Sequence, residues 1–361
     1  MIFVACSPGE QRVAVLNAGG ALLDYAIDRP GRPDGVGDVL RGRVVARVPT
    51  MAGAFVALPD TEGFLPDSAG AAGLGVGDSV CVRITRSAQG GKGPRLAAHG
   101  TAPPGPPALL TRGPSSAVRL AGLHPGLPVF VDDPAVLGPW RAALGDRLRA
   151  GAWDEAVAAQ VDALASPGVA LPGGMAATIT PTPALVAIDL DMAAATAGRG
   201  AKAAAQRDAN RAALPALARQ IRLRNVSGAI VIDLAGMAMR RRVTLAPDMA
   251  AALADDPLQP RFLGFTALGL AEILRPRVHP PLHELLAGPH AAGLRVLRLL
   301  DRDYAANPGT ALRVIAAPDV HRALSEDTAA AADVLRRTGR ALLLRPDPAL
   351  PPGHAHIERH V

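Results

Sequence analysis

The sequence is poor in cysteine and has no long apolar run. Cys6 and Cys81 are the only cysteines, and neither belongs to a CxxC pattern. This excludes a disulfide framework and a cysteine zinc site, so we expect two buried reduced thiols. No uninterrupted apolar stretch reaches the roughly 18 residues of a membrane span. Because Met1–Cys6 also lacks the basic flank of a signal peptide, we expect a cytoplasmic protein without a membrane partner.

Lysine and aromatic residues are also scarce. Lys92 and Lys202 are the only lysines, although the net charge is +6 and the pI about 10.2. A basic balance favours a polyanionic partner, with nucleic acid ahead of a membrane surface. Arginine suits bidentate phosphate contacts, but a GC-rich genome produces the same arginine excess. Aromatic residues make up 3% of the chain, so Phe55 and Phe64 in one short segment are notable.

The first third of the chain has the pattern of strands and turns. We expect strands over 2–6, 12–16 and 20–27. Residues 36–99 hold short β runs separated by glycine and proline, which predicts a small barrel. Residues 100–128 form a connector rich in proline and glycine, with one further strand at 108–111.

The rest of the chain alternates strands with helices. Strands are expected over 129–131, 177–180, 185–188, 311–316 and 340–344, and helices over 133–148, 153–165, 201–224, 247–254, 266–274, 291–300 and 320–337. A proline-rich tail follows, which we expect to be mobile.

Two aspartates each end a run of branched apolar residues. Asp189 closes 184–188, and Asp233 closes 229–232. A helical crossover between the two runs predicts parallel neighbouring strands with both carboxylates at one sheet edge, where open α/β sheets bind ligands. Two such carboxylates can share Mg²⁺, which activates water and stabilises phosphate charge. The alternative is that both are strand-end turn formers or helix caps.

Several motifs resemble the ribonuclease E/G family. The most specific is the stretch Ala218–Asp233, followed by Thr182–Asp189 and Gly269–Arg277. Further matches lie at 28–31, 37–44, 51–56, 63–66, 91–96, 337–339 and 345–348.

The resemblance implies an α/β, multidomain (α+β) architecture. An S1-type OB-fold barrel over 35–104 would interrupt an RNase H-like subdomain formed by 1–34 and 105–172. A DNase I-like metal-binding subdomain would follow over 173–286, and a small C-terminal α/β domain over 287–361.

The implied activity is Mg²⁺-dependent endonuclease hydrolysis of single-stranded RNA in RNA processing and decay. Asp189 and Asp233 would be metal ligands and catalytic residues. Asp191 would be a third catalytic residue, at a position where the family usually has asparagine. Gly236 stands where the family commonly has another aspartate. Changes in residues that contact the metal ligands, and not the metal itself, often cost about 10–100-fold in metal affinity or activity.

The resemblance also implies RNA contacts. Phe55 and Phe64 would stack bases, and Lys92 would contact a phosphate. Their alternatives are barrel-core phenylalanines and an ordinary loop lysine. The basic helix would be a phosphate track beside the metal or, alternatively, a solvated face; its residues are Arg207, Arg211, Arg219, Arg222 and Arg224. Arg240–Arg242 would act likewise, and Asn210 would be a structural or outer partner.

Two family features are missing from the sequence. The module that grips a substrate 5′-monophosphate is absent, because Gly113–Arg119 passes almost directly to Leu127–Asp133. Without a CxxC zinc link we expect a monomer or homodimer and no zinc-linked tetramer. His279 and His283 are separated by two prolines, which disfavours a helical zinc pair. The rival functions are a non-catalytic RNA-binding protein on this scaffold and a DNA-directed nuclease.

Overall fold

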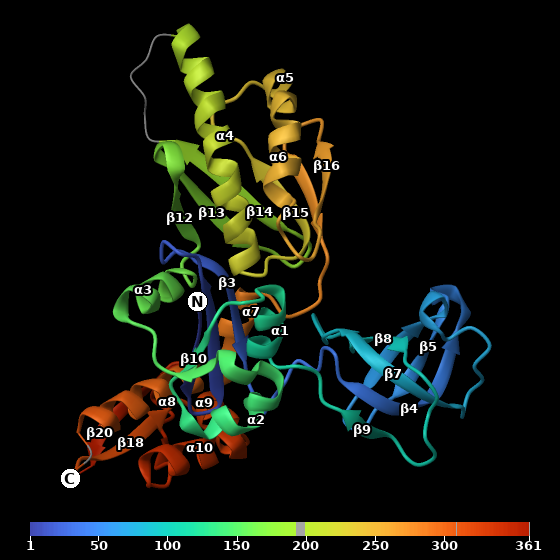
Figure 1. The fold of residues 1–361 in the computed structure, drawn as a ribbon, viewed down its shortest axis with the longest axis vertical. Helices are drawn as coiled ribbons and strands as arrows, with labels where there is room; N and C mark the ends of the chain where they lie inside the picture. Colours follow the sequence, from blue (N-terminus) through green and yellow to red (C-terminus); the bar gives the residue numbers. More distant parts are fainter. Residues whose placement is uncertain (193–198, 308, 361) are drawn as a thin grey trace.

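The protein is described by a computed structural model that covers residues 1–192, 199–307 and 309–360. Within these residues the fold is mixed α/β, with four β-sheets. Figure 1 shows a barrel standing to one side of a body in which the N-terminal sheet lies between the C-terminal unit and a larger α/β unit. No helix in the described ranges is long and apolar enough to cross a membrane.

The N-terminal sheet has the strand order β11-β10-β1-β2-β3. The three expected strands are confirmed as β1 (Ile2–Ser7), β2 (Glu10–Leu16) and β3 (Leu22–Asp28). The chain returns after the barrel to add β10 (Val129–Val131), parallel to β1, and β11 (Leu148–Ala150). The accompanying helices are α1 (Ser116–Leu123), α2 (Pro134–Leu144) and α3 (Glu155–Ala163). Both cysteines are buried and free, as expected.

The expected barrel is confirmed as a closed sheet of five strands. The order β5-β6-β8-β7-β4 closes because β4 also pairs with β5. Its strands are β4 (Val39–Val48), β5 (Gly53–Ala57), β6 (Glu62–Pro66), β7 (Ser79–Arg86) and β8 (Arg95–Ala98), and β9 (Ala108–Thr111) adds to β4. Only residues 112–115 separate β9 from α1.

The large sheet has the order β12-β13-β14-β15-β17-β16. Its strands are β12 (Gly168–Leu171), β13 (Met175–Pro181), β14 (Val186–Met192), β15 (Gly228–Asp233), β16 (Arg261–Phe265) and β17 (Ala271–Arg275). Helices α4 (Arg199–Leu223) and α6 (Ala246–Leu253) cover one face (Figure 1). Because β12 pairs with β13, the domain boundary expected at 172/173 falls inside this sheet.

The helix expected over 266–274 is wrong, because this segment is the turn and second strand of the β16–β17 hairpin. Thr266 makes the turn: its hydroxyl oxygen accepts from the backbone N–H groups of Leu268 and Leu270. Gly269 has a φ of 81°, which glycine adopts without strain. Turn chemistry and cross-strand pairing therefore override the apolar spacing that suggested a helix.

The C-terminal unit has the strand order β19-β18-β20. The expected tail is wrong: β20 (Ala355–His360) pairs antiparallel with β18 (Ala311–Ala316). The expected strand at 340–344 is instead β19 (Leu344–Pro346), and the expected helix over 320–337 divides at Asp327 into α9 (Pro318–Ser325) and α10 (Thr328–Thr338). Helices α7 (Leu282–Leu286) and α8 (Gly288–Ala306) connect β17 to β18, and the short helix α5 (Met239–Arg242) lies earlier, between β15 and α6.

Candidate functional site

Asp189 and Asp233 lie side by side on neighbouring strands. Strands β14 and β15 pair in parallel, with Asp189 directly opposite Asp233 in the register. The crossover between them contains α4, so the predicted strand–helix–strand arrangement is confirmed. Neighbouring strands lie about 4.8 Å apart, so carboxylates at matched positions can approach one cation.

Both carboxylates lie on the open face of the sheet. Along β14, Ile188 and Leu190 are buried against the helices, while Asp189 and Asp191 are exposed. Asp233 is likewise exposed, and the preceding residue, Ile232, belongs to the core. Since strand side chains alternate between faces, the three aspartates occupy the face opposite α4 and α6.

Negative charge accumulates at this edge. Partial burial and the nearby carboxylates of Asp191 and Asp233 together raise the pKa of Asp189. The like charges disfavour ionisation of Asp189, and a bound cation would relieve the repulsion. Asp191 therefore does more than occupy an outer position, because its charge acts on the neighbouring site residue.

Arg242 already contacts one of the two carboxylates. Its Nη1 donates to Asp233 Oδ1 at 2.6 Å and to the Gly269 carbonyl at 3.0 Å, and its Nε donates to the Met237 carbonyl at 3.0 Å. The Arg242 side chain is 13% exposed, whereas that of Asp233 is 51% exposed. The guanidinium thus orients Asp233 from the protein side, and the carboxylate keeps access to solvent.

The carboxylate pair fits a magnesium ion better than a transition metal. Among the described residues, no group of three or more His, Cys, Asp or Glu side chains is placed to hold a metal. Mg²⁺ needs no such cage, because it is commonly bound through one or two carboxylates while retaining several waters. The all-oxygen donors Asp189 and Asp233 satisfy that requirement.

Asn210 fixes the chain just beyond Asp233. The asparagine is completely buried on α4. Its Nδ2 donates to the Ala235 carbonyl at 3.0 Å, and its Oδ1 accepts from the Ala235 N–H at 3.1 Å. Gly236 follows with a φ of 63°, and a Cβ there would stand 2.3 Å from Gln206 Nε2. The position where the family commonly has aspartate is therefore packed against α4.

The structure does not bring the arginines of α4 to the carboxylates. Arg211 pairs with Asp248 at 2.9 Å, Arg207 pairs with Asp208 at 3.2 Å, and Arg219 is exposed. Leu214, Leu217 and Ile221 pack against the core face of the sheet, so the helix lies behind the aspartates. Arg222 and Arg224 instead join parts of the body, through Asp24 and the Ser166 carbonyl respectively.

Phe55 and Phe64 form a pair on the outer surface of the barrel. They are cross-strand neighbours, with ring centroids 5.6 Å apart and an angle of 65° between the rings. The barrel core uses their sequence neighbours Val56 and Leu65, while both phenylalanines are half-buried. The alternative of barrel-core phenylalanines is therefore not supported. Lys92 is exposed on the turn between β7 and β8.

Sequence reasoning missed one acidic residue on the open face. Glu272 on β17 pairs with Val231, which shares its face with Asp233 two residues on. The carboxylate is therefore a diagonal neighbour of Asp233. The alternation of buried Ala271 and Ile273 around Glu272 was the available signal, and the wrong helix expectation for this segment obscured it.

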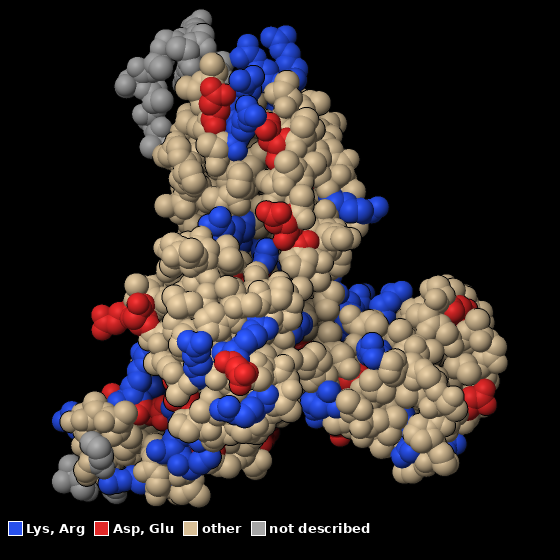
Figure 2. Space-filling view, in the orientation of Figure 1, with Lys and Arg blue, Asp and Glu red and all other residues tan. Residues whose placement is uncertain are grey.

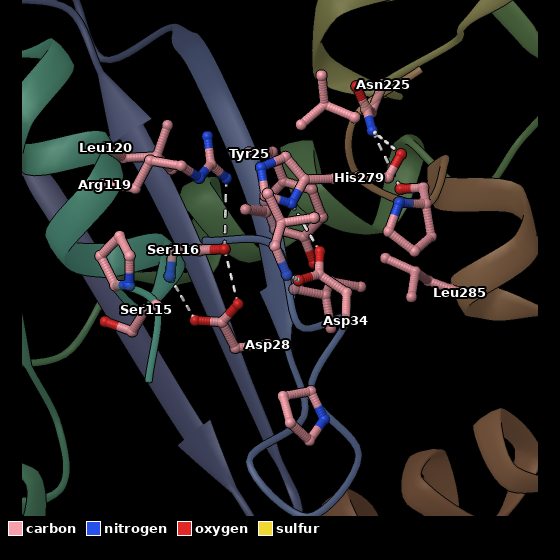
Figure 3. A pocket seen from close by; sticks show the side chains of 18 of the residues that line it. Tyr25, Asp28, Asp34, Ser115, Ser116, Arg119, Leu120, Asn225, His279 and Leu285 are labelled. Carbon is pink, nitrogen blue, oxygen red and sulfur yellow. Dashed lines mark hydrogen bonds and ion pairs between the residues drawn. The ribbon is translucent and has the colours of Figure 1, made fainter. Parts of the chain in front are cut away.

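A separate cavity of about 680 Å³ lies between β3, α1 and the segment before α7. Figure 3 shows its polar groups joined to one another: Asp28 accepts from the Ser116 backbone and hydroxyl, and Asp34 pairs with His279 at 2.6 Å. Burial would raise the pKa of Asp34, but the His279 contact outweighs it and the pKa is lowered. These contacts attach the segments that lead into and out of the barrel to the body, away from Asp189 and Asp233.

The comparisons with known proteins match the region that carries the carboxylate pair. Residues 153–278 match the model of the Ribonuclease E/G family. This region of the chain is similar to that family. It includes Asp189, Asp233, Asn210 and Arg242, and it ends just after β17.

Curated relatives named Ribonuclease E share the similarity. The protein from Nostoc sp. is 35% identical over 135 residues, covering 36% of this chain and 19% of the relative. The one from Synechocystis sp. is 33% identical over 124 residues, covering 34% of this chain and 18% of the relative. The Escherichia coli protein is 27% identical over 219 residues, covering 56% of this chain and 20% of the relative. The chain thus spans about a fifth of the length of these relatives.

Proposed function

We propose that the protein is a Mg²⁺-dependent endoribonuclease that hydrolyses phosphodiester bonds of single-stranded RNA. The observation that carries the proposal is the in-register pair of Asp189 and Asp233 on an open sheet face, inside the region that matches the Ribonuclease E/G family. The curated relatives of this region carry the name Ribonuclease E.

The residues of the site have distinct roles in this proposal. Asp189 and Asp233 hold Mg²⁺, which when bound supplies charge stabilisation of the phosphate and a more acidic water. Arg242 orients the Asp233 carboxylate through its contact at 2.6 Å. Asn210 holds the backbone beyond β15 and so keeps the end of that strand in place. Asp191 adds negative charge that strengthens cation binding and tunes the protonation of Asp189.

The barrel grips the RNA in this scheme. The exposed edges and faces of Phe55 and Phe64 offer stacking surfaces, each worth about 1–3 kcal/mol per base. Lys92 lies on the turn between β7 and β8, and β8 pairs with the strand that carries Phe64. We assign the barrel to the S1 type, the N-terminal sheet to an RNase H-like subdomain and the large sheet to a DNase I-like subdomain that begins with β12.

A cleavage assay tests the proposal. Purified wild type is incubated with a labelled single-stranded RNA and Mg²⁺, beside Asp189→Asn, Asp233→Asn and the control Asp303→Asn, an exposed residue of α8. We expect each site variant to lose more than the roughly 100-fold that removal of an outer partner costs. The control should cleave like wild type. Equal cleavage by wild type and both site variants contradicts the proposal.

A non-catalytic RNA-binding protein is the second candidate. The contact between Arg242 and Asp233 favours it, because a guanidinium at a carboxylate competes with a metal ion. Such a protein would bind RNA with a salt-dependent affinity and show no Mg²⁺-dependent turnover. Binding and cleavage measured on one preparation separate the two candidates.

A further inference from the structure

A row of matched side chains crosses the outer surface of the barrel. Phe55 on β5 is opposite Phe64 on β6, Phe64 is opposite Arg95 on β8, and Arg95 is opposite Arg86 on β7. Residues paired across strands share a face of the sheet. Two aromatic rings and two guanidinium groups therefore follow one another across four strands.

The row continues onto the large sheet through Arg277. The backbone N–H of Ser87, next to Arg86, donates to the carbonyl of Val278, next to Arg277, at 2.9 Å. This bond joins the end of β7 to the segment that leaves β17. Gly228, the first residue of β15, leaves space for Arg277, because a Cβ there would stand 2.7 Å from Arg277 Nε.

Three arginines lie near one another where the barrel meets the body. Arg86, Arg95 and Arg277 have no hydrogen bond or ion pair from their side chains within the described residues. Arg86 Nε is buried without a partner. Burial lowers the pKa of Arg86, and the charges of Arg95 and Arg277 lower it further. Figure 2 shows basic side chains gathered where the barrel meets the body.

We propose that Arg86, Arg95 and Arg277 form a phosphate-binding site for single-stranded RNA, which carries the strand from the stacking pair Phe55–Phe64 onto the sheet that holds Asp189 and Asp233. A phosphate of the RNA would supply the anion that this cluster lacks, and its oxygens would accept hydrogen bonds from the guanidinium groups. Strand β15 begins at Gly228, beside Arg277, and ends at Asp233, although the alternation of the strand places these two residues on opposite faces of the sheet. The inference rests on the proposed function and adds residues from two sheets to its substrate path.

The melting temperature distinguishes a phosphate-binding role of the three arginines from a structural role. Like charges without acidic partners oppose the closure of the barrel against the body, and a buried unpaired donor adds to the cost. Replacing the arginines should therefore leave the melting temperature unchanged or raise it. Arginines that held the two units together would lower it when replaced.

The experiment measures binding of a fluorescent oligouridylate in EDTA, as a function of salt, so that cleavage plays no part. The proteins are wild type, the triple variant Arg86→Gln/Arg95→Gln/Arg277→Gln, the triple lysine variant at the same positions and the control Arg302→Gln on α8. Each phosphate contact adds about 0.7 to the slope of log affinity against log salt for single strands. We expect the glutamine variant to lose about 2 from the slope. The lysine variant and the control should keep it.

Two results overturn the inference. The first is a glutamine variant with the wild-type slope, whatever its cleavage rate. The second is a lowered melting temperature together with equal loss of binding in the glutamine and lysine variants, which assigns the arginines to structure. If the glutamine variant behaves as expected while wild type shows no Mg²⁺-dependent cleavage, the phosphate site stands and the nuclease proposal fails.

Discussion

Removing the Asn210 side chain should destabilise the protein and displace the end of β15 that carries Asp233. In Asn210→Ala, the N–H and carbonyl of Ala235 both lose their partner, in a region where Ala235 is 9% exposed. A buried polar group left without a partner costs about 1–3 kcal/mol. The Gln206 carbonyl, which also accepts from Asn210, retains its helical bond and adds little. The expected loss of unfolding free energy from the two groups is therefore about 2–6 kcal/mol.

Urea unfolding followed by circular dichroism measures this loss, with Asn210→Asp as the matched variant. The aspartate keeps the acceptor for the Ala235 N–H but cannot donate to its carbonyl. Burial raises the pKa of such a carboxyl, so the folded variant binds its proton more tightly than the unfolded chain. Its stability relative to wild type should therefore fall as the pH rises from 4 to 7. An Asn210→Ala protein within about 0.5 kcal/mol of wild type would refute the reasoning.

Three further predictions concern the site and its substrate. Asp191→Asn removes a charge that raises the pKa of Asp189, so the acid limb of the cleavage pH profile should move to lower pH; an unchanged limb would oppose this. Arg242→Gln removes a cation that competes with Mg²⁺ for Asp233, so the Mg²⁺ concentration at half-maximal cleavage should fall. A rise in that concentration would show that the guanidinium does not compete with Mg²⁺. Since only residues 112–115 separate β9 from α1, cleavage should show little preference among 5′-monophosphate, 5′-triphosphate and circular RNA. A strong preference for the 5′-monophosphate would require a sensor elsewhere.

Local patterns predicted the elements that position the site. The branched apolar runs before Asp189 and Asp233 gave buried strands, and the alanine-rich stretch between them gave the crossover helix, so their parallel pairing followed from topology. The glycine-punctuated β runs likewise predicted the barrel. These features depend on short-range chemistry and on general rules of chain connection.

The features that sequence reasoning missed depend on pairing between distant segments. The β16–β17 hairpin relies on side-chain bonds from Thr266, and its misassignment hid Glu272. The position of α4 behind the aspartates was readable from the alternation of Ile188 and Asp189, but the charge of its arginines suggested a role beside the metal. The contact of Arg242 with Asp233 requires the placement of α5, which no local pattern specifies.

The central claim is that Asp189 and Asp233 act together on one Mg²⁺ during RNA cleavage. Single-turnover rates over a Mg²⁺ titration for wild type, Asp189→Asn, Asp233→Asn and the double variant test it directly. Residues that act as one unit are not additive, so each single variant should lose the Mg²⁺-dependent rate and the double variant should be no slower. A single variant that keeps most of this rate, or losses that multiply in the double variant, would contradict the account.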